Sequence, residues 1–484
     1  MFAQSTNRFK GFSLQHISKD TRQDTLQPTQ KALLRSIPKV DTLLAHADLQ
    51  DFDKAFILPL IYEHLQALRD SILQGAKPST DINTHAKNIK SQAMQAQAPT
   101  MQSVINATGV VIHTNLGRSV FSQEIMEQIT PLLTAYNTLE YDLHKGKRGE
   151  RYIHATQILA QMFGVESALL VNNNAASVLL ILNTFAKDKE VIISRGELVE
   201  IGGSFRIPEV MKSASSILRE VGATNKTHLH DYENAINEQT AMIMKAHQSN
   251  FKQVGFTKDC HIKELITLAK KHNLIDYFDL GSGHCGILSL KDEPSVSEIC
   301  KYKPSLLSFS GDKLFGGPQL GIILGKKELI EQLKANQLLR ALRVDKFSIL
   351  ALIATLQAYK DKAYHKIPTL NMLSLPLEKL ESKARHLQSL IAQSRISQQV
   401  QVEVLMLSSL AGGGSVPHIE FESWGVSLQS KILNAKAFEE KLRLKGLITC
   451  IQKDKILLDM RTLLPHDEEK IVMILESVLG QSND

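Results

Sequence analysis

The sequence is poor in cysteine and contains no long apolar run. Its 484 residues include only four cysteines, with no CxxC pair and no Cys/His cluster, which excludes a disulfide scaffold and gives no indication of a structural zinc site. These are Cys260, Cys285, Cys300 and Cys450. The longest apolar stretch, 349–356, falls far short of the roughly 20 residues that span a bilayer, and residues 1–20 lack the apolar core of a secretory signal. We therefore expect a protein of a reducing compartment, the cytoplasm, with no membrane partner.

The composition is that of a globular protein. Hydrophobic residues make up 43% and charged residues 22% of the chain, which excludes a mostly disordered, collagen-like or coiled-coil protein. At about 100–200 residues per domain, the length predicts two or three domains. The formal net charge is +6, and residues 1–39 carry seven Lys or Arg against two Asp. A polyanionic partner is compatible with this charge but is not required by it.

Changes in sequence pattern divide the chain into five parts. Residues 1–30 are polar and basic and predict a flexible arm. Apolar residues at helical spacing predict a small helical domain over 31–75. Polar residues rich in Ala and Gln indicate a linker or surface helix over 76–104. We expect a large domain over 105–355 and a smaller α+β domain over 356–484.

The large domain alternates short apolar runs with amphipathic stretches. The predicted strands are 168–171, 191–193, 241–244, 274–278, 306–309 and 320–324. A helix is expected over 261–272 and a long helical stretch over 328–364, and further strands over 402–407, 419–421, 426–428 and 455–459. Strands and helices in alternation predict an α/β fold with a mostly parallel sheet.

The first chemical signal is Lys313, in the segment SFSGDKLFGGPQLG at 308–321. A strand ends in a polar turn that carries one lysine, and glycines follow that let the backbone pass close to a ligand. Burial disfavours the ammonium form of such a lysine, so that its amine can form a Schiff base. Taken alone, it is more often a surface lysine.

The second signal is Asp279, which follows a buried strand in LIDYFDLGSG at 274–283. Open α/β sheets bind ligands at the carboxyl ends of their strands. In pyridoxal phosphate (PLP) enzymes a carboxylate pairs with the protonated pyridine nitrogen while a lysine holds the aldehyde carbon. Asp276 is a competitor for this role but lies further from the strand end, and a plain turn or capping role for Asp279 remains open.

The third signal is the segment LLVNNNAAS at 169–177. An apolar strand runs into asparagines and small residues that open a helix, and backbone N–H groups there form a phosphate seat. Our phosphate candidates are Asn174, Ala175 and Ala176, although N-capping by Asn would show the same pattern without a ligand. This phosphate seat, Asp279 and Lys313 follow one another along the chain. That order matches the large domain of fold-type-I PLP enzymes.

Three arginines extend the predicted site. Arg340 and Arg343 are spaced i, i+3, so they would share one helix face and could clamp a tetrahedral oxyanion. Arg118 lies in a Gly-containing loop before the sheet. Solvated surface arginines remain the alternative on this pattern alone.

At these residues the sequence resembles the bacterial selenocysteine synthase family, the L-seryl-tRNA(Sec) selenium transferases. The matching segments are 105–118, 139–149, 171–176, 194–208, DLGSG at 279–283, SGDKLFGGPQ at 310–319, GGGS at 412–415 and LDMRT at 458–462, and 37–44 resembles the family's N-terminal motif. The sequence departs from the family at His284 and Cys285, beside the expected cofactor pocket, and at 449–452, in the small domain.

The resemblance implies a reaction. Lys313 would carry PLP as a Schiff base, Asp279 would keep its pyridine nitrogen protonated, and Arg118, Arg340 and Arg343 would bind selenophosphate. The seryl hydroxyl of L-seryl-tRNA(Sec) would be eliminated to leave an aminoacrylyl-tRNA, and selenium would add to give L-selenocysteinyl-tRNA(Sec). The resemblance also implies a homodecamer built from dimers.

The resemblance also implies that the N-terminal domain binds the tRNA, and the basic residues there are the candidates for contacts with its phosphates. The candidate residues are Arg8, Lys10, Lys19, Arg22, Lys31, Arg35 and Lys39. A solvated tail would have the same composition. Two other functions remain open, namely a PLP lyase or aminotransferase acting on a free small amino acid, and a tRNA-binding protein without catalysis. The first would not need the basic arm, and the second would not need Asp279 and Lys313.

Overall fold

The computed structural model describes residues 27–97, 99–198, 200–201, 205–250, 252–291 and 293–480. The chain divides into two compact units, residues 1–102 and 103–484. Among the described residues, no helix combines the length and the apolar character needed to cross a membrane.

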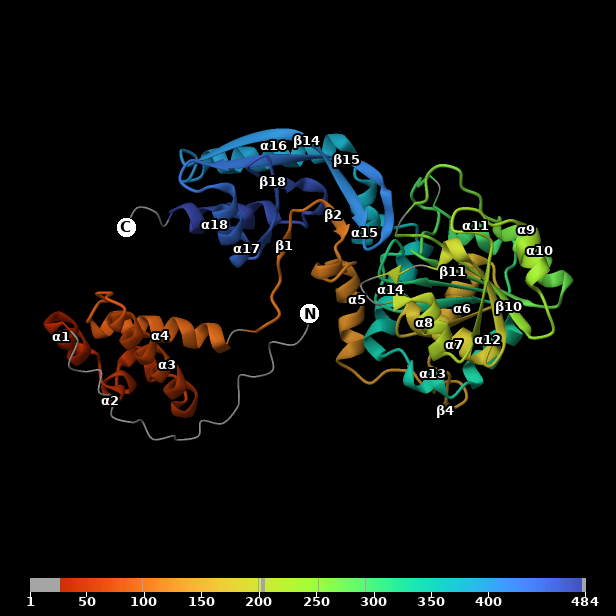
Figure 1. Cartoon of the computed structure of the whole chain (residues 1–484), viewed down its shortest axis with the longest axis horizontal. Coiled ribbons are helices and arrows are strands. Elements are labelled where there is room, and N and C mark those ends of the chain that lie inside the picture. The colour runs from red at the N-terminus through yellow and green to blue at the C-terminus, as the bar shows by residue number, and fades with distance from the viewer. Residues whose placement is uncertain are drawn as a thin grey trace. The chain divides into compact units, whose positions relative to one another are not determined.

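The first unit is a small helical bundle (Figure 1). Its elements are α1 (Pro28–Ser36), α2 (Val40–Leu44), the 3-10 turn η2 (Ala47–Leu49), α3 (Lys54–Leu73) and α4 (Ile82–Gln97). Helix α4 occupies most of the stretch expected to be a linker or surface helix, because Ala86, Ile89 and Ala93 pack into the core of this unit. These small apolar residues are spaced for one helix face, although the segment around them is polar.

The large domain is built on a seven-stranded sheet of order β5-β13-β12-β11-β10-β6-β9. The strands are β5 (Ser167–Val171), β6 (Glu190–Ser194), β9 (Ile217–Val221), β10 (Thr240–Ala246), β11 (Ile275–Gly281), β12 (Leu306–Ser310) and β13 (Gly321–Gly325). All neighbouring pairs are parallel except those of β13, which is antiparallel to β12 and β5. The predicted α/β fold with a mostly parallel sheet is confirmed. The sequence did not reveal β9, an edge strand with a largely exposed, polar-interrupted pattern.

Helices cover this sheet (Figure 1). They include α6 (Ile153–Phe163), α7 (Asn174–Phe185), α8 (Ile207–Ser213), α9 (Leu229–Ala235), α10 (Ile262–Lys271), α11 (Val296–Cys300), α12 (Lys327–Ala335), α13 (Leu338–Ala341) and α14 (Lys346–Lys360). The helix α5 (Gln123–Leu133) packs against α14 through Ile125 and Ile129. The strands and the helices packed on the sheet share one continuous core, and the contact between α5 and α14 forms a smaller separate cluster.

The long helical stretch expected over 328–364 is interrupted twice, so that prediction was wrong in its continuity. Helix α12 ends at Asn336, whose side chain accepts a hydrogen bond from the Leu338 N–H. Asp345 caps the start of α14 by accepting from the Ser348 N–H. Because α13 ends at Ala341, Arg343 lies beyond it, and Arg340 and Arg343 do not share a helix face as we predicted.

The small domain has a five-stranded sheet of order β17-β18-β15-β14-β2. Its elements are β14 (Val400–Gly412), β15 (Ser415–Ser430), β17 (Cys450–Gln452), β18 (Lys455–Asp459), α16 (Leu377–Gln393), α17 (Ala435–Leu444) and α18 (Asp467–Leu479). Strands β1 (Ile105–Asn106) and β2 (Val110–Ile112), expected in the large domain, pair instead with β16 (Leu447–Ile448) and β14. Helix α15 (Pro368–Ser374), expected in the small domain, packs into the large-domain core through Leu370 and Met372.

Candidate active site

Asp279 lies near the carboxyl end of β11, with 9% of its surface exposed. The Asn174 side-chain amide donates to its Oδ1 at 2.8 Å, and the Gly281 N–H donates to the same oxygen at 3.2 Å. Burial raises the pKa of Asp279, and the Asn174 hydrogen bond and the Lys313 charge oppose this rise. The carboxylate therefore has one oxygen fixed by the protein.

Asp276, the competing carboxylate, has a different environment. It is the second residue of β11, and its two oxygens accept from the Ser305 N–H and hydroxyl, each at 2.7 Å. Both oxygens are thus committed to the loop before β12. This favours a structural role for Asp276 and leaves Asp279 as the carboxylate near the strand end.

Lys313 lies in the turn after β12 and is 7% exposed. Burial lowers the pKa of its amine, and the nearby Asp279 and Asp312 carboxylates oppose this effect. Glycines make the turn possible. A Cβ atom at Gly311 would lie 2.6 Å from the Pro318 carbonyl oxygen, and one at Gly283 would lie 2.7 Å from that of Ser310. A buried amine with a lowered pKa is suited to act as a nucleophile and base.

The predicted phosphate seat forms the start of α7. Asn173 caps this helix, because its Oδ1 accepts from the Ala176 N–H at 2.8 Å. Ala175 is exposed and Ala176 is buried, while the Asn174 side chain reaches Asp279. The helix start and the β11 carboxylate are therefore adjacent, as a ligand with both a phosphate and a ring nitrogen requires.

Arg118 lies beside the lysine turn. Its Nη1 is 2.8 Å from Oδ2 of Asp312, the residue before Lys313. The backbone there is left-handed, with φ of 91° at Gly117 and 63° at Arg118. A non-glycine residue in this region costs roughly 1–2 kcal/mol, so the loop holds Arg118 in place at some expense.

Arg340 and Arg343 are both exposed, and their backbone segment lies next to the turn that precedes α7. The Leu342 carbonyl accepts from the Asn172 N–H at 3.1 Å, which fastens this segment to the turn between β5 and α7. The two arginines are thus placed by the phosphate-seat turn, whereas Arg118 is placed by Asp312.

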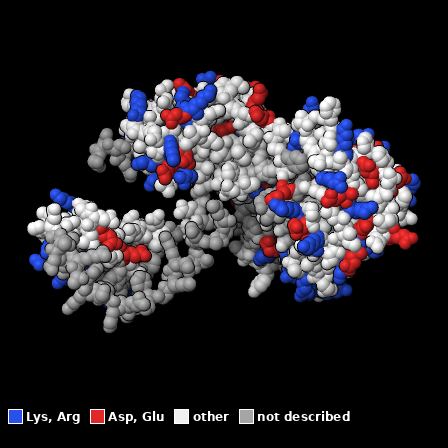
Figure 2. All heavy atoms as spheres, in the orientation of Figure 1, with Lys and Arg blue, Asp and Glu red and all other residues white. Residues whose placement is uncertain are grey.

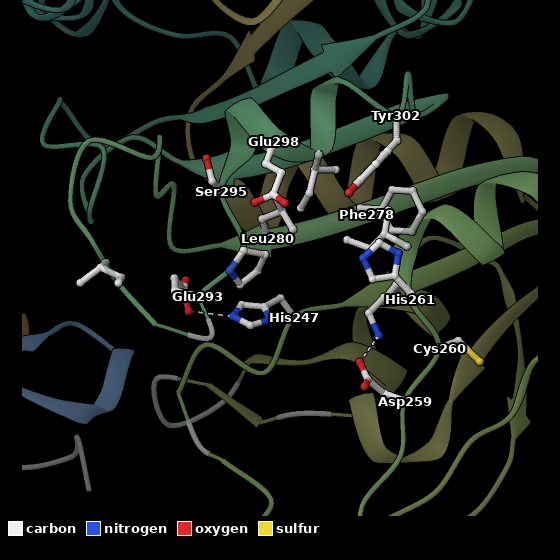
Figure 3. Close-up of a pocket in the computed structure, with 15 residues that line it drawn as sticks. His247, Asp259, Cys260, His261, Phe278, Leu280, Glu293, Ser295, Glu298 and Tyr302 are labelled. Atoms are coloured by element: carbon white, nitrogen blue, oxygen red, sulfur yellow. Dashed lines mark hydrogen bonds and ion pairs between the residues drawn. The ribbon is translucent and has the colours of Figure 1, made fainter.

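A buried network that the sequence did not reveal lies next to the site. Glu293, 7% exposed, accepts from the Ser282 hydroxyl and lies 2.9 Å from Nε2 of His247. Figure 3 shows His247 and Glu293 side by side in the wall of a cavity of about 540 Å³. Phe278 and Leu280 also line this cavity, and because side chains alternate along a strand it lies across β11 from Asp279. Only Ser282, within DLGSG, carried a sequence signal.

The two departures from the family pattern lie in different places. His284 is buried beside this network, and burial lowers its pKa while Glu293 opposes the shift. Cys285 is also buried. Residues 449–452 belong largely to β17 at the edge of the small-domain sheet. The first departure therefore adjoins the site, and the second lies in the small domain.

The residues fit PLP. A buried lysine and a buried carboxylate near each other supply the two groups that hold its aldehyde carbon and ring nitrogen. Among the residues that the structure describes, Asn174 Oδ1 and Ser249 Oγ are buried without a hydrogen-bond partner. Ser249 Oγ would lie 3.3 Å from a Cβ at Gly281, next to the Asp279 segment. Unpaired buried polar atoms of this kind need a polar partner, which a bound cofactor supplies.

Comparisons with known proteins agree with this geometry. The sequence model of the SelA family, described as L-seryl-tRNA selenium transferase, matches residues 104–464. The L-seryl-tRNA(Sec) selenium transferase of Helicobacter hepaticus is 68% identical over 452 residues, covering 93% of this chain and 99% of that protein. That of Wolinella succinogenes is 49% identical, covering 92% and 99%.

A solved structure supports the fold independently. D-Glucosaminate-6-phosphate ammonia-lyase aligns with a TM-score of 0.56 at 19% identity, over 81% of this chain and 99% of that chain. This likeness confirms the fold-type-I class predicted for the large domain. With the family match covering the lysine turn, the carboxylate strand and all three arginines, the chain belongs to the SelA family of L-seryl-tRNA selenium transferases.

Proposed function

We propose that this protein converts L-seryl-tRNA(Sec) to L-selenocysteinyl-tRNA(Sec) with selenophosphate, in a PLP-dependent reaction. The observation that carries the proposal is the family match over 104–464, which includes a buried Lys313 near a buried Asp279. When bound, PLP supplies an electron sink for the charge that develops at the seryl Cα.

The protein's own groups have distinct tasks. Lys313 would hold the cofactor through its Nζ, and the same amine would accept the proton from the seryl Cα, because burial lowers its pKa and favours the unprotonated form. Asp279 would accept a hydrogen bond from the ring nitrogen and keep that nitrogen protonated. The start of α7 would receive the phosphate through the N–H groups of Asn174 and Ala175, whereas the N–H of Ala176, the third predicted residue, already donates to Asn173 Oδ1.

Selenophosphate binding is assigned to Arg118, Arg340 and Arg343. Guanidinium groups form charge-assisted and often bidentate contacts with phosphate oxygens. Asp312 holds Arg118 next to Lys313 through their 2.8 Å ion pair, so the donor would be bound close to the reacting carbon. The hydroxyl would leave as water, selenium would form its new bond to the β-carbon, and water would cleave the P–Se bond so that phosphate is released.

We assign tRNA binding to the helical unit. Lys31 and Arg35 are exposed, one turn apart on α1, and Lys39 is exposed just before α2. The other predicted arm residues, Arg8, Lys10, Lys19 and Arg22, lie outside the described residues. Figure 2 shows basic and acidic side chains interspersed over the visible face of the large domain, so charge there does not single out a second RNA surface on that face.

Deleting residues 1–102 tests this assignment. We expect binding of tRNA(Sec) to weaken at least about tenfold, since basic contacts to phosphates are lost, while PLP binding to the remaining unit stays unchanged. A filter-binding assay and a cofactor absorbance titration measure the two effects. Unchanged tRNA affinity would contradict the assignment without touching the cofactor site.

Turnover assays decide between the proposed reaction and its rivals. Purified protein is incubated with PLP, selenophosphate and either charged tRNA(Sec) or free serine. We expect selenium to appear on the tRNA only. Reaction of free serine alone would indicate a lyase or aminotransferase, and tRNA binding without turnover would indicate a protein that lacks catalysis. The homodecamer and the cytoplasmic location stay predictions, the first of which sedimentation can measure.

A further inference from the structure

Three successive asparagines after β5, the last of which is the first residue of α7, have three different environments. The Asn172 side chain is exposed, and its backbone N–H bonds to the Leu342 carbonyl. Asn173 caps α7 through the Ala176 N–H. Asn174 turns its side chain away from the helix and donates from Nδ2 to Asp279 Oδ1, a contact between residues 105 positions apart.

The Asn174 contact is not needed to start the helix, because Asn173 already supplies the cap. It connects the phosphate side of the site to the carboxylate side. The Gly281 N–H donates to the same Oδ1, so both donors fix one oxygen of Asp279. Within the described part of the chain, Oδ2 is left for a ring nitrogen.

We propose that the Asn174 side chain is a positioning residue that acts through Asp279: it orients the carboxylate and stabilises its ionised form, while only the Asn174 backbone belongs to the phosphate seat. The proposal rests on the proposed function, because it needs PLP at this site. It assigns to Asn174 a task on the ring-nitrogen side of the cofactor.

The physical reason is the cost of a buried charge. Burial raises the pKa of Asp279, and the Asn174 hydrogen bond is the largest of the effects that oppose it. Hydrogen bonds to ionised groups are stronger than those between neutral groups. Without the amide, Asp279 would keep its proton to a higher pH, and a neutral carboxyl group holds the proton on the ring nitrogen less well.

The test is a double-mutant cycle in which the affinity of each apoprotein for PLP is measured between pH 5.5 and 9. The variants are Asn174→Ala, Asp279→Asn and the pair together, with Asn172→Ala as the matched control from the same turn. PLP affinity should fall at low pH, where Asp279 takes up a proton; this part of the pH profile is the acid limb. We expect Asn174→Ala to weaken PLP binding about tenfold near pH 6 and less near pH 9, because the acid limb moves up by about one pH unit. Asn172→Ala should behave as the unaltered protein.

Two results would overturn the inference. One is an equal loss of affinity from Asn174→Ala in the Asp279→Asn background, which indicates a phosphate contact independent of Asp279. The other is a loss of affinity with no movement of the acid limb, which indicates a merely structural contact.

A second variant distinguishes a change at Asp279 from misfolding. Asn174→Asp keeps the shape of the side chain but places a carboxylate against Asp279, so it should move the acid limb further upward than Asn174→Ala does. Circular dichroism and thermal unfolding of each apoprotein check that the variants fold. If the unaltered protein fails to bind PLP, the proposed function fails; if it binds PLP and the variants match it, only this inference fails.

Discussion

Each end of β11 carries a buried carboxylate, Asp276 at the amino end and Asp279 at the carboxyl end. Burial shifts the pKa of both in the same direction, but the two side chains have different hydrogen-bond partners and different roles. Burial raises the pKa of both Asp276 and Asp279. At the amino end, Ser305 occupies both oxygens of Asp276. At the carboxyl end, the side-chain amide of Asn174 and the N–H of Gly281 both donate to one oxygen of Asp279, and a buried lysine lies nearby. A perturbed carboxylate therefore indicates a functional site only when part of its hydrogen-bonding capacity remains uncommitted.

Replacing one lysine at each end of β11 should give the largest difference in turnover. Lys313→Ala removes the amine that holds the cofactor and accepts the Cα proton, so we expect turnover to fall at least about a thousandfold. The absorbance band of the lysine-bound cofactor should disappear with it. Lys326→Ala, an exposed lysine at the amino end, is the control and should keep both. A Lys313 variant that retained both signals would refute the assignment.

The carboxylates themselves give the next contrast. Asp279→Asn removes the negative charge opposite the ring nitrogen, and we expect kcat to fall about hundredfold or more, since proton placement contributes effects of this size. Asp276→Asn should leave kcat within about twofold, because its oxygens bond to Ser305. Steady-state kinetics on charged tRNA(Sec) measures both. Equal losses in the two variants would remove the distinction between the two ends of the strand.

The sequence predicted this contrast only in part. It predicted most strands of the large domain, and it predicted a phosphate-binding turn, a carboxylate and a lysine in that order along the chain. Apolar runs and the polar residues that follow them are local features, which is why these could be predicted. It could not predict that Asn174 reaches Asp279 or that Glu293 meets His247, because these contacts join distant segments. The break at Asp345 was missed because the capping Asp lies within an otherwise helical apolar pattern.

Domain boundaries show the same limit. Ile105 and Ala107 lie at the start of the predicted large domain, 105–355, yet they pack in the small-domain core because β1 pairs with β16. Strand pairing between residues about 340 positions apart leaves no local pattern. Two hydrogen bonds also join the segments 105–118 and 458–462, since the Gly109 N–H donates to Thr462 Oγ1 and the Asp459 N–H donates to the Ala107 carbonyl.

Asp276→Asn should act on stability where Asp279→Asn acts on rate. At low pH Asp276 is protonated, and the substitution replaces its acid O–H with a weaker amide donor beside Ser305, so the free energy of unfolding should fall by about 1 kcal/mol near pH 3. Because the native pKa of Asp276 is raised, its contribution to stability is present below the unfolded pKa and declines as the pH rises through the native pKa. The cost of the substitution should therefore shrink toward pH 7. Urea unfolding of the apoprotein at several pH values measures it, and a cost that grows with pH would contradict the sign.

The smallest expected effect comes from backbone conformation at the two ends. Lys303, exposed after α11 at the amino end, has a φ of 55°, and Arg118 at the carboxyl end has a φ of 63°. Glycine adopts such angles without strain, although it loses more entropy on folding, so Lys303→Gly should raise the free energy of unfolding by less than about 1 kcal/mol and leave turnover unchanged. Arg118→Gly relieves the same strain but removes the ion pair with Asp312, and it should raise the KM for selenophosphate. Thermal unfolding and kinetics of the two variants separate these outcomes. If Arg118→Gly changed stability alone, the strained backbone at the carboxyl end would be a turn like the one at Lys303, with no link to the donor site.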